Sequence, residues 1–129
     1  MTMTTSDAEL RRTELAPAAA LFRSLADATR LAILRRLALG HARVVDLVGE
    51  LGLAQATVSA HLACLRDCGL VDSQPVGRAS LFRMIRPELT ELLAAGETLL
   101  AATGSAVVLC PECGGEESRV GGRGAGEVT

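Results

Sequence analysis

The chain has 129 residues, which is enough for one domain with tails and too few for a second core. A net charge of −2 argues against a generic binder of polyanions, although a charge averaged over the chain hides where the charges lie. Hydrophobic residues make up 49% of the sequence, but no run reaches the roughly 18 apolar residues of a membrane span. The amino terminus also lacks the basic segment followed by an apolar segment that is typical of a signal peptide. We therefore expect a cytoplasmic protein with no membrane partner.

The first segments predict an arm followed by two helices. Residues 1–13 are polar and aperiodic, which predicts a flexible N-terminal arm. Pro17 suits the first turn of a helix that ends near Ala26. Asp27 is a good N-cap for a second helix over residues 28–39.

A helix-turn-helix is predicted next. One helix covers Val44–Leu51 and stops at Gly52, and the next begins about three residues later, near Gln55, and ends at Gly69. Two short helices joined by a tight glycine-containing turn are typical of a motif whose second helix enters the DNA major groove. The inward positions of that second helix are Val58, Leu62 and Leu65.

After Gly69 the periodicity changes. Segments 70–76 and 80–85 predict a two-stranded hairpin, or wing, in which Pro75 requires an edge position. Pro87 then opens a last helix that reaches about residue 103, with more apolar surface than one small domain needs. The predicted fold is therefore mainly α with a small β-hairpin, a winged helix-turn-helix of order α-α-α-α-β-β-α.

These elements divide the chain into three parts. Residues 1–13 form the arm, residues 14–103 form the winged-helix domain for DNA binding and dimerisation, and residues 104–129 form a cysteine-containing, largely disordered tail.

The second helix of the motif carries side chains that suit DNA. Gln55 can bond adenine bidentately, and Thr57 and Ser59 can reach bases or phosphates. Arg78 lies at the tip of the wing, where it can meet a phosphate or the minor groove. The alternatives are an ordinary solvated helix face and an ordinary turn arginine.

Four cysteines in a cytosolic chain favour metal binding or redox chemistry over structural disulfides. Cys64 and Cys68 are four residues apart on one helix, with Cβ atoms about 5–6 Å apart, which suits a bridging metal ion better than a disulfide. Cys110 and Cys113 form a CxxC knuckle. The alternatives are buried small hydrophobic residues for the first pair, and a redox dithiol or half of a structural zinc site for the second.

The sequence resembles the ArsR/SmtB family of metalloregulators over roughly residues 15–103. The matching segments are LFRSLADATRLAILRRL, VSAHLACLRDCGLV and the glycine-arginine turn of the wing. The resemblance implies a homodimer, built from the first and last helices, that binds double-stranded operator DNA and represses a promoter until an inducer binds. It also favours packing or a DNA contact over metal ligation for His61.

Within that family, the sequence is similar to the CmtR-like sensors of cadmium and lead. That similarity implies a thiolate site made of Cys64, Cys68 and Cys110, with Cys113 as a further candidate ligand. Sulfur ligands favour soft ions. We expect Cd²⁺ or Pb²⁺ as the inducer, with Zn²⁺ as an alternative and a thiol-redox or reactive-sulfur inducer as the competing hypothesis. The sequence contains no nucleophile–base constellation and no phosphate-binding loop, so we expect no enzymatic activity.

Overall fold

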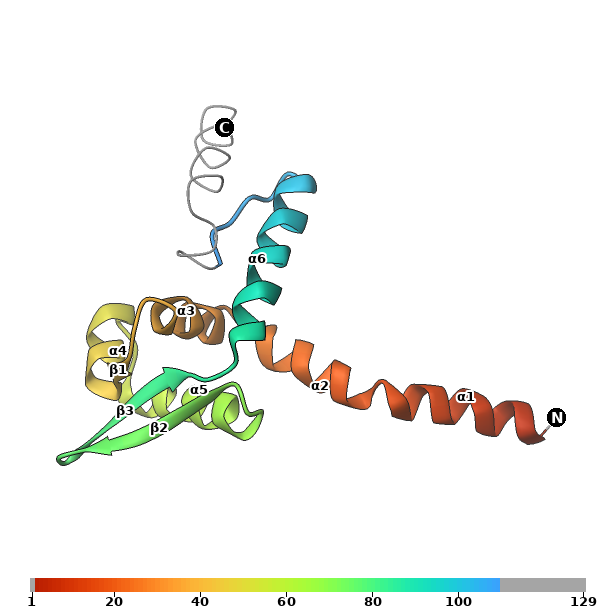
Figure 1. Ribbon diagram of the computed structural model, residues 1–129, viewed down its shortest axis with the longest axis horizontal. Coiled ribbons are helices and arrows are strands. Elements are labelled where there is room, and N and C mark those ends of the chain that lie inside the picture. The colour runs from red at the N-terminus through yellow and green to blue at the C-terminus, as the bar shows by residue number, and fades with distance from the viewer. Residues whose placement is uncertain (1, 110–129) are drawn as a thin grey trace.

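Helices predominate in the protein, and three short strands form one sheet (Figure 1). The computed structural model describes residues 2–109. The helices are α1 Thr2–Glu14, α2 Ala16–Leu25, α3 Ala28–Leu37, α4 Val44–Leu51, α5 Gln55–Asp67 and α6 Pro87–Ala102, and the strands are β1 Ala42–Arg43, β2 Val71–Val76 and β3 Ala79–Met84. The predicted winged helix-turn-helix is confirmed.

A single hydrophobic core holds α3, α4 and α5 against the sheet and the start of α6. Ile33 and Leu34 of α3 and Leu47 of α4 are fully buried, as are the three predicted inward residues of α5. Burying a side chain of this size contributes about 1.5–3 kcal/mol each. The core therefore determines which face of α5 packs inward and which face it presents to solvent.

The turn between α4 and α5 depends on a glycine. Gly52 has φ +68, in the left-handed region, and its N–H donates to the carbonyl of Val48. Only glycine adopts this conformation without strain. Three residues later α5 begins at Gln55, as predicted, although its N-cap residue Ala54 provides no side-chain hydrogen bond.

The wing contains one more strand than predicted. β2 and β3 pair antiparallel from Val71↔Met84 to Val76↔Ala79, and Gly77 and Arg78 form the two-residue turn between them. β1 pairs with the other side of β3, which gives the order β1-β3-β2. Pro75 lies in the edge strand β2, where it was expected.

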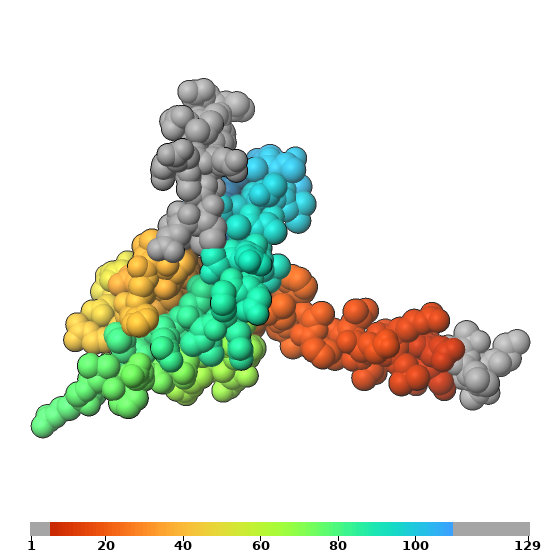
Figure 2. Space-filling model, in the orientation of Figure 1, coloured from red at the N-terminus to blue at the C-terminus, as the bar shows by residue number. Residues whose placement is uncertain are grey.

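The N-terminal segment differs from the irregular arm that we expected. Residues 2–14 form the helix α1, which continues nearly in line with α2 and extends away from the rest of the molecule (Figures 1 and 2). The described side chains of α1 are almost all exposed. The segment lacks an apolar stripe, and good helix formers such as alanine, glutamate, leucine and arginine account for the helix.

The last helix, α6, rises from the sheet and ends at Ala102 (Figure 1). Leu89 and Leu93 are buried near its start, whereas Leu99 near its end is 66% exposed. Part of the apolar surface of this helix, beyond what the core of one domain needs, is therefore exposed. Among the described residues, no helix is long and apolar enough to cross a membrane.

Candidate functional site

The outward face of α5 carries the polar side chains that we expected to contact DNA. Gln55, Thr57 and Ser59 are exposed on the side opposite the buried core residues. None of the three makes a side-chain hydrogen bond to another described residue. Their donors and acceptors are therefore available to base edges and phosphates.

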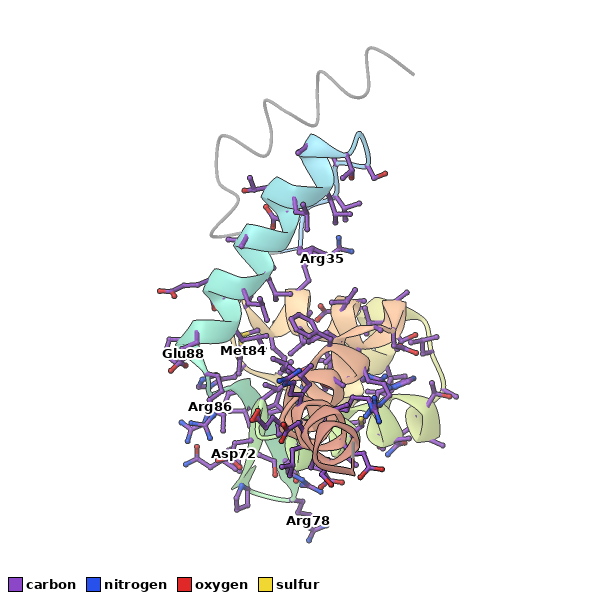
Figure 3. The ribbon with its side chains drawn as sticks, turned by 90° about the vertical axis from the view of Figure 1, so that its right-hand side faces the viewer. Arg35, Asp72, Arg78, Met84, Arg86 and Glu88 are labelled. Atoms are coloured by element: carbon purple, nitrogen blue, oxygen red, sulfur yellow. The ribbon has the colours of Figure 1, made fainter. Side chains whose placement is uncertain are left out.

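Arg78 lies at the far end of the wing (Figure 3). Three other arginines in this region are already engaged: Arg66 donates to Ser73 Oγ at 3.3 Å, Arg83 lies 3.8 Å from Asp72, and Arg86 donates to the Gly69 carbonyl at 2.9 Å. Arg78, in contrast, has no hydrogen-bond or ion-pair partner within the described residues. Its charge is free for a phosphate.

His61 is partly buried and is held by contacts with α3 and with its N-cap. The Arg30 guanidinium lies 3.2 Å from His61 Nδ1, and Asp27 Oδ1 lies 4.0 Å from His61 Nε2. Arg30 also donates to the carbonyls of Ser24 at 2.6 Å and Arg23 at 3.1 Å, at the end of α2. His61 thus ties the recognition helix α5 to the junction of α2 and α3, while a role for it in DNA contact stays a prediction.

Arg30 was not among the residues predicted to form the site. The signal that points to it is its place three residues after the predicted N-cap Asp27. There its N–H donates to Asp27 Oδ1 at 3.0 Å, and its side chain donates back to carbonyls of α2. The carboxylate of Asp27 accepts this N–H, which lowers its pKa below the usual 3.8, and the nearby His61 and Arg30 side chains act in the same direction.

A second carboxylate fixes the start of α4. The side chain of Arg43 donates to Asp46 at 3.1 and 3.2 Å, and its backbone N–H donates at 3.0 Å. These hydrogen bonds lower the pKa of Asp46 and raise the pKa of Arg43. These local contacts cap α4 at its start, whereas the Arg30–His61 contact ties the centre of α5 to α3.

The two helix cysteines lie at the end of α5. Cys64 is half-buried in the last turn, and Cys68 is the exposed C-cap, with its N–H donating to the Cys64 carbonyl. Neither is in a disulfide. The structure thus brings these two predicted ligands together on adjacent turns. Cys110 and Cys113 lie outside the described residues.

A cavity of about 380 Å³ lies beside Cys68. Arg86 and Glu88, at the start of α6, line it together with Leu21 of α2 and Leu92 of α6 (Figure 3). Within residues 2–109, no three His, Cys, Asp or Glu side chains lie close enough to hold a metal ion.

A helix-turn-helix with a wing, an exposed polar recognition helix and an unpaired arginine at the wing tip defines a winged-helix transcriptional regulator. Comparison with known proteins agrees, since residues 27–73 match the family model described as bacterial regulatory protein, arsR family.

Similar proteins support the same assignment. The chain is 34% identical over 98 residues to a probable mercury resistance operon repressor of Streptomyces lividans, covering 76% of this chain and 78% of that protein. It is 40% identical over 85 residues to the transcriptional regulator CmtR of Mycobacterium tuberculosis, covering 66% and 70%.

A solved structure has the same architecture. The homodimeric winged helix-turn-helix DNA-binding domain of Mb0332 from Mycobacterium bovis matches with a TM-score of 0.63 and 28% identity, covering 69% of this chain and 82% of that one. The chain belongs to the ArsR family of bacterial transcriptional regulators, which confirms the resemblance and the expectation that it is not an enzyme.

Proposed function

We propose that the protein is a metal-responsive repressor that binds operator DNA as a homodimer, and that a soft metal ion bound by cysteine thiolates releases it from DNA. The ligands in this proposal are Cys64 and Cys68 at the end of α5, together with Cys110 and Cys113 of the tail. A repressor of this kind works in the bacterial cytoplasm, where its operator is.

One observation carries the proposal. The helix that presents Gln55, Thr57 and Ser59 also carries two thiols, one turn apart, at its opposite end. Thiolates are preferred ligands of soft cations, and an ion that joins them to the tail pulls on the helix that reads DNA. Typical coupling between two such sites is about 1–3 kcal/mol, or roughly 5–150-fold in affinity.

Exposed apolar side chains support a dimer that forms through α2, the first predicted helix, and α6, the last. Three large apolar side chains on these helices are exposed: Leu15 at the start of α2 (62%), Phe22 within α2 (56%) and Leu99 of α6 (66%). Phe22 and Leu99 line one apolar groove of about 470 Å³ between α2, α3 and α6. A second copy of the chain would bury these side chains, as expected for exposed apolar surface of this size.

Cadmium and lead come first among the candidate ions, because the chain is similar to CmtR and the resemblance to CmtR-like sensors implies a site of the helix pair and the tail cysteine. Zinc and, from the similarity to the mercury resistance repressor, mercury are the alternatives. A sulfur-only ligand set does not by itself discriminate among these ions.

The test begins by selecting duplexes that bind the metal-free protein from a randomised DNA pool. Fluorescence anisotropy then measures the Kd for the selected duplex with and without one equivalent of Cd²⁺, Pb²⁺, Zn²⁺ or Hg²⁺. We expect the inducing ion to raise the Kd by roughly 5–150-fold. An unchanged Kd for fully metal-loaded protein refutes the proposal.

Variants separate sensing from folding. Cys64→Ser should bind the duplex like the wild type and lose the response to metal. Ala63→Ser is the matched control, since it adds a hydroxyl to the neighbouring half-buried position and keeps both thiols. If Cys64→Ser fails to bind DNA even without metal, the thiol has a structural role instead.

The competing hypothesis, a thiol-redox or reactive-sulfur inducer, is favoured by the exposure of Cys68. It predicts that mild peroxide removes two titratable thiols and releases DNA in the absence of metal. Thiol titration before and after peroxide, combined with the same anisotropy assay, discriminates between the two inducers.

A further inference from the structure

The segment after α6 turns back on the body of the protein. Gly104 has φ +85, in the left-handed region, and the Ser105 N–H donates to the Leu100 carbonyl at 2.8 Å, so the chain reverses at the end of the helix. The following residues run back beside α6 (Figure 1). Residues 105–109 form a strap that lies against α3 and the middle of α6.

Two polar contacts fasten the strap. The N–H of Leu109 donates to Glu97 Oε2 of α6 at 2.6 Å, and the side chain of Arg35 of α3 donates to the Val108 carbonyl at 3.0 Å. Glu97 is only 6% exposed, and hydrogen bonds that involve a charged group are among the stronger ones in proteins. The backbone of the strap is therefore attached to two helices at neighbouring residues.

The side chain of Leu109 is part of an apolar groove. It packs against the core cluster and lines the groove of about 470 Å³ that also contains Phe22 of α2 and Leu99 of α6. Its contact with α6 is close, since a Cβ added at Gly96 would lie 3.3 Å from Leu109 Cδ1. The strap thus supplies one wall of this groove, and the helices supply the others.

The chemistry of the groove indicates what it can bind. Among the described residues that line it, every one is apolar or is a glycine. Such a surface offers nothing to a phosphate or to a metal ion, but it can bury apolar side chains of another protein surface. Phe22 and Leu99 are exposed on the same patch, at 56% and 66%. A patch that has both a hollow and exposed apolar side chains can be self-complementary, as a two-fold dimer requires.

We infer that the strap forms part of the surface on which a second copy of the chain docks, so that the affinity of the dimer depends on a closed strap. The inference rests on the homodimer proposed above, through α2 and α6. A strap that opens removes the Leu109 wall from the groove and an N–H donor from the Glu97 carboxylate. A second copy would then cover a carboxylate that has lost this donor, which is unfavourable.

The strap is separate from the surface that is expected to read DNA. Its hydrogen bonds to other described residues go to α3 and α6, and none goes to α5. Opening the strap should therefore alter DNA binding only through the dimer. The affinity for DNA should fall at protein concentrations where the dimer dissociates, and should match the wild type where all the protein is dimeric.

The test uses two variants of the full, metal-free chain, and sedimentation velocity over a dilution series measures the dissociation constant of the dimer. Leu109→Ala removes the wall of the groove. Gly104→Val leaves every groove side chain in place but strains the reversal of the chain, because a β-branched residue is disfavoured at φ +85. We expect each variant to raise the dissociation constant about 10-fold or more, since a two-fold dimer contains the change twice.

The matched controls are Ala102→Val, at an exposed position near the end of α6, and Val76→Ala, at an exposed position of the wing. Both should keep the dissociation constant within twofold of the wild type. Hydrogen exchange of the Leu109 amide should be faster in Gly104→Val, which reports the opening of the strap directly. The circular dichroism of both strap variants should match the wild type, because both changes lie after the last helix.

The outcomes separate the strap from the dimer. A wild type that stays monomeric at every concentration overturns the proposed homodimer, and with it this role of the strap. A dimeric wild type whose dissociation constant changes less than twofold in Leu109→Ala shows that α2 and α6 suffice, and overturns the role of the strap alone.

Discussion

Replacing Arg30 by lysine should loosen the recognition helix without removing a charge. The guanidinium donates to the carbonyls of Ser24 and Arg23 and meets His61 Nδ1, at 2.6, 3.1 and 3.2 Å. These partners belong to two different helices. A lysine ammonium is a single point on a flexible stem and cannot hold all three acceptors at once.

The expected loss follows from the contacts. If lysine keeps one of the three hydrogen bonds, two are lost, and each contributes about 0.5–1.5 kcal/mol net. The hydrogen bond to the Arg23 carbonyl is exposed, so water can replace part of the loss. We therefore expect Arg30→Lys to lower the free energy of unfolding by about 1–2 kcal/mol, and the coupling between Arg30 and His61 to be about 1 kcal/mol.

Urea denaturation measures both quantities, the second through a double-mutant cycle with His61→Ala. Arg11→Lys is the control, because Arg11 is exposed on α1 and makes no side-chain hydrogen bond to a described residue. Affinity for the selected duplex should also fall several-fold, since His61 lies two residues after Ser59. Stability within about 0.5 kcal/mol of the wild type, together with zero coupling, would refute the role given to Arg30.

Three other predictions concern the core, a carboxylate and the wing. Leu62→Ala, at a fully buried position of α5, should lower the free energy of unfolding by about 2–5 kcal/mol in urea denaturation, and a loss below about 1 kcal/mol would contradict the packing described. The N–H of Arg30 lowers the pKa of Asp27 below 3.8, so the stability that Asp27 contributes is present above about pH 4 and is lost as the pH falls through the native pKa. Asp27→Asn, which keeps a good N-cap, should therefore flatten the fall in stability below about pH 4, and an unchanged slope would count against this assignment. Arg78→Ala should weaken binding to all duplexes alike and reduce the slope of log K against log salt by about 2, one for each wing of the homodimer, whereas a change in sequence preference would indicate a base contact instead.

The helix α5 and its outward face could be predicted from the sequence, because the apolar spacing and the flanking glycines indicate the same helix. The apolar residues Val58, Leu62 and Leu65 recur at helical spacing. Gly52 ends the preceding helix, and Gly69 follows the end of α5. The polar residues between the apolar ones are then placed on the outer face by geometry alone. The exposure of Gln55, Thr57 and Ser59 follows from that placement.

Other features have no periodic signal. β1 has only two residues, Ala42 and Arg43, and exists because β3 offers it a free edge, which is a tertiary contact. The partnership of Arg30 with His61 joins residues 31 positions apart. Glu97 did leave a trace in the sequence, since it continues the spacing of Leu89 and Leu93 and so places a carboxylate on the buried face of α6.

The place of His61 along α5 bears on how a metal ion at one end of the helix can alter DNA binding at the other. Gln55 lies six residues before His61 and Cys68 seven after it, which corresponds to about 9 and 10 Å along the helix axis. The contact with Arg30 is thus near the centre of a rigid rod. In the proposed mechanism, a displacement of about 1 Å at the thiols tilts the rod about this contact and moves Gln55 by a similar distance. Hydrogen bonds to base edges tolerate only a few tenths of an ångström, so a shift of this size is enough to release the operator. The same geometry predicts that weakening the central contact, as in Arg30→Lys, reduces the effect of metal on DNA affinity as well as the affinity itself.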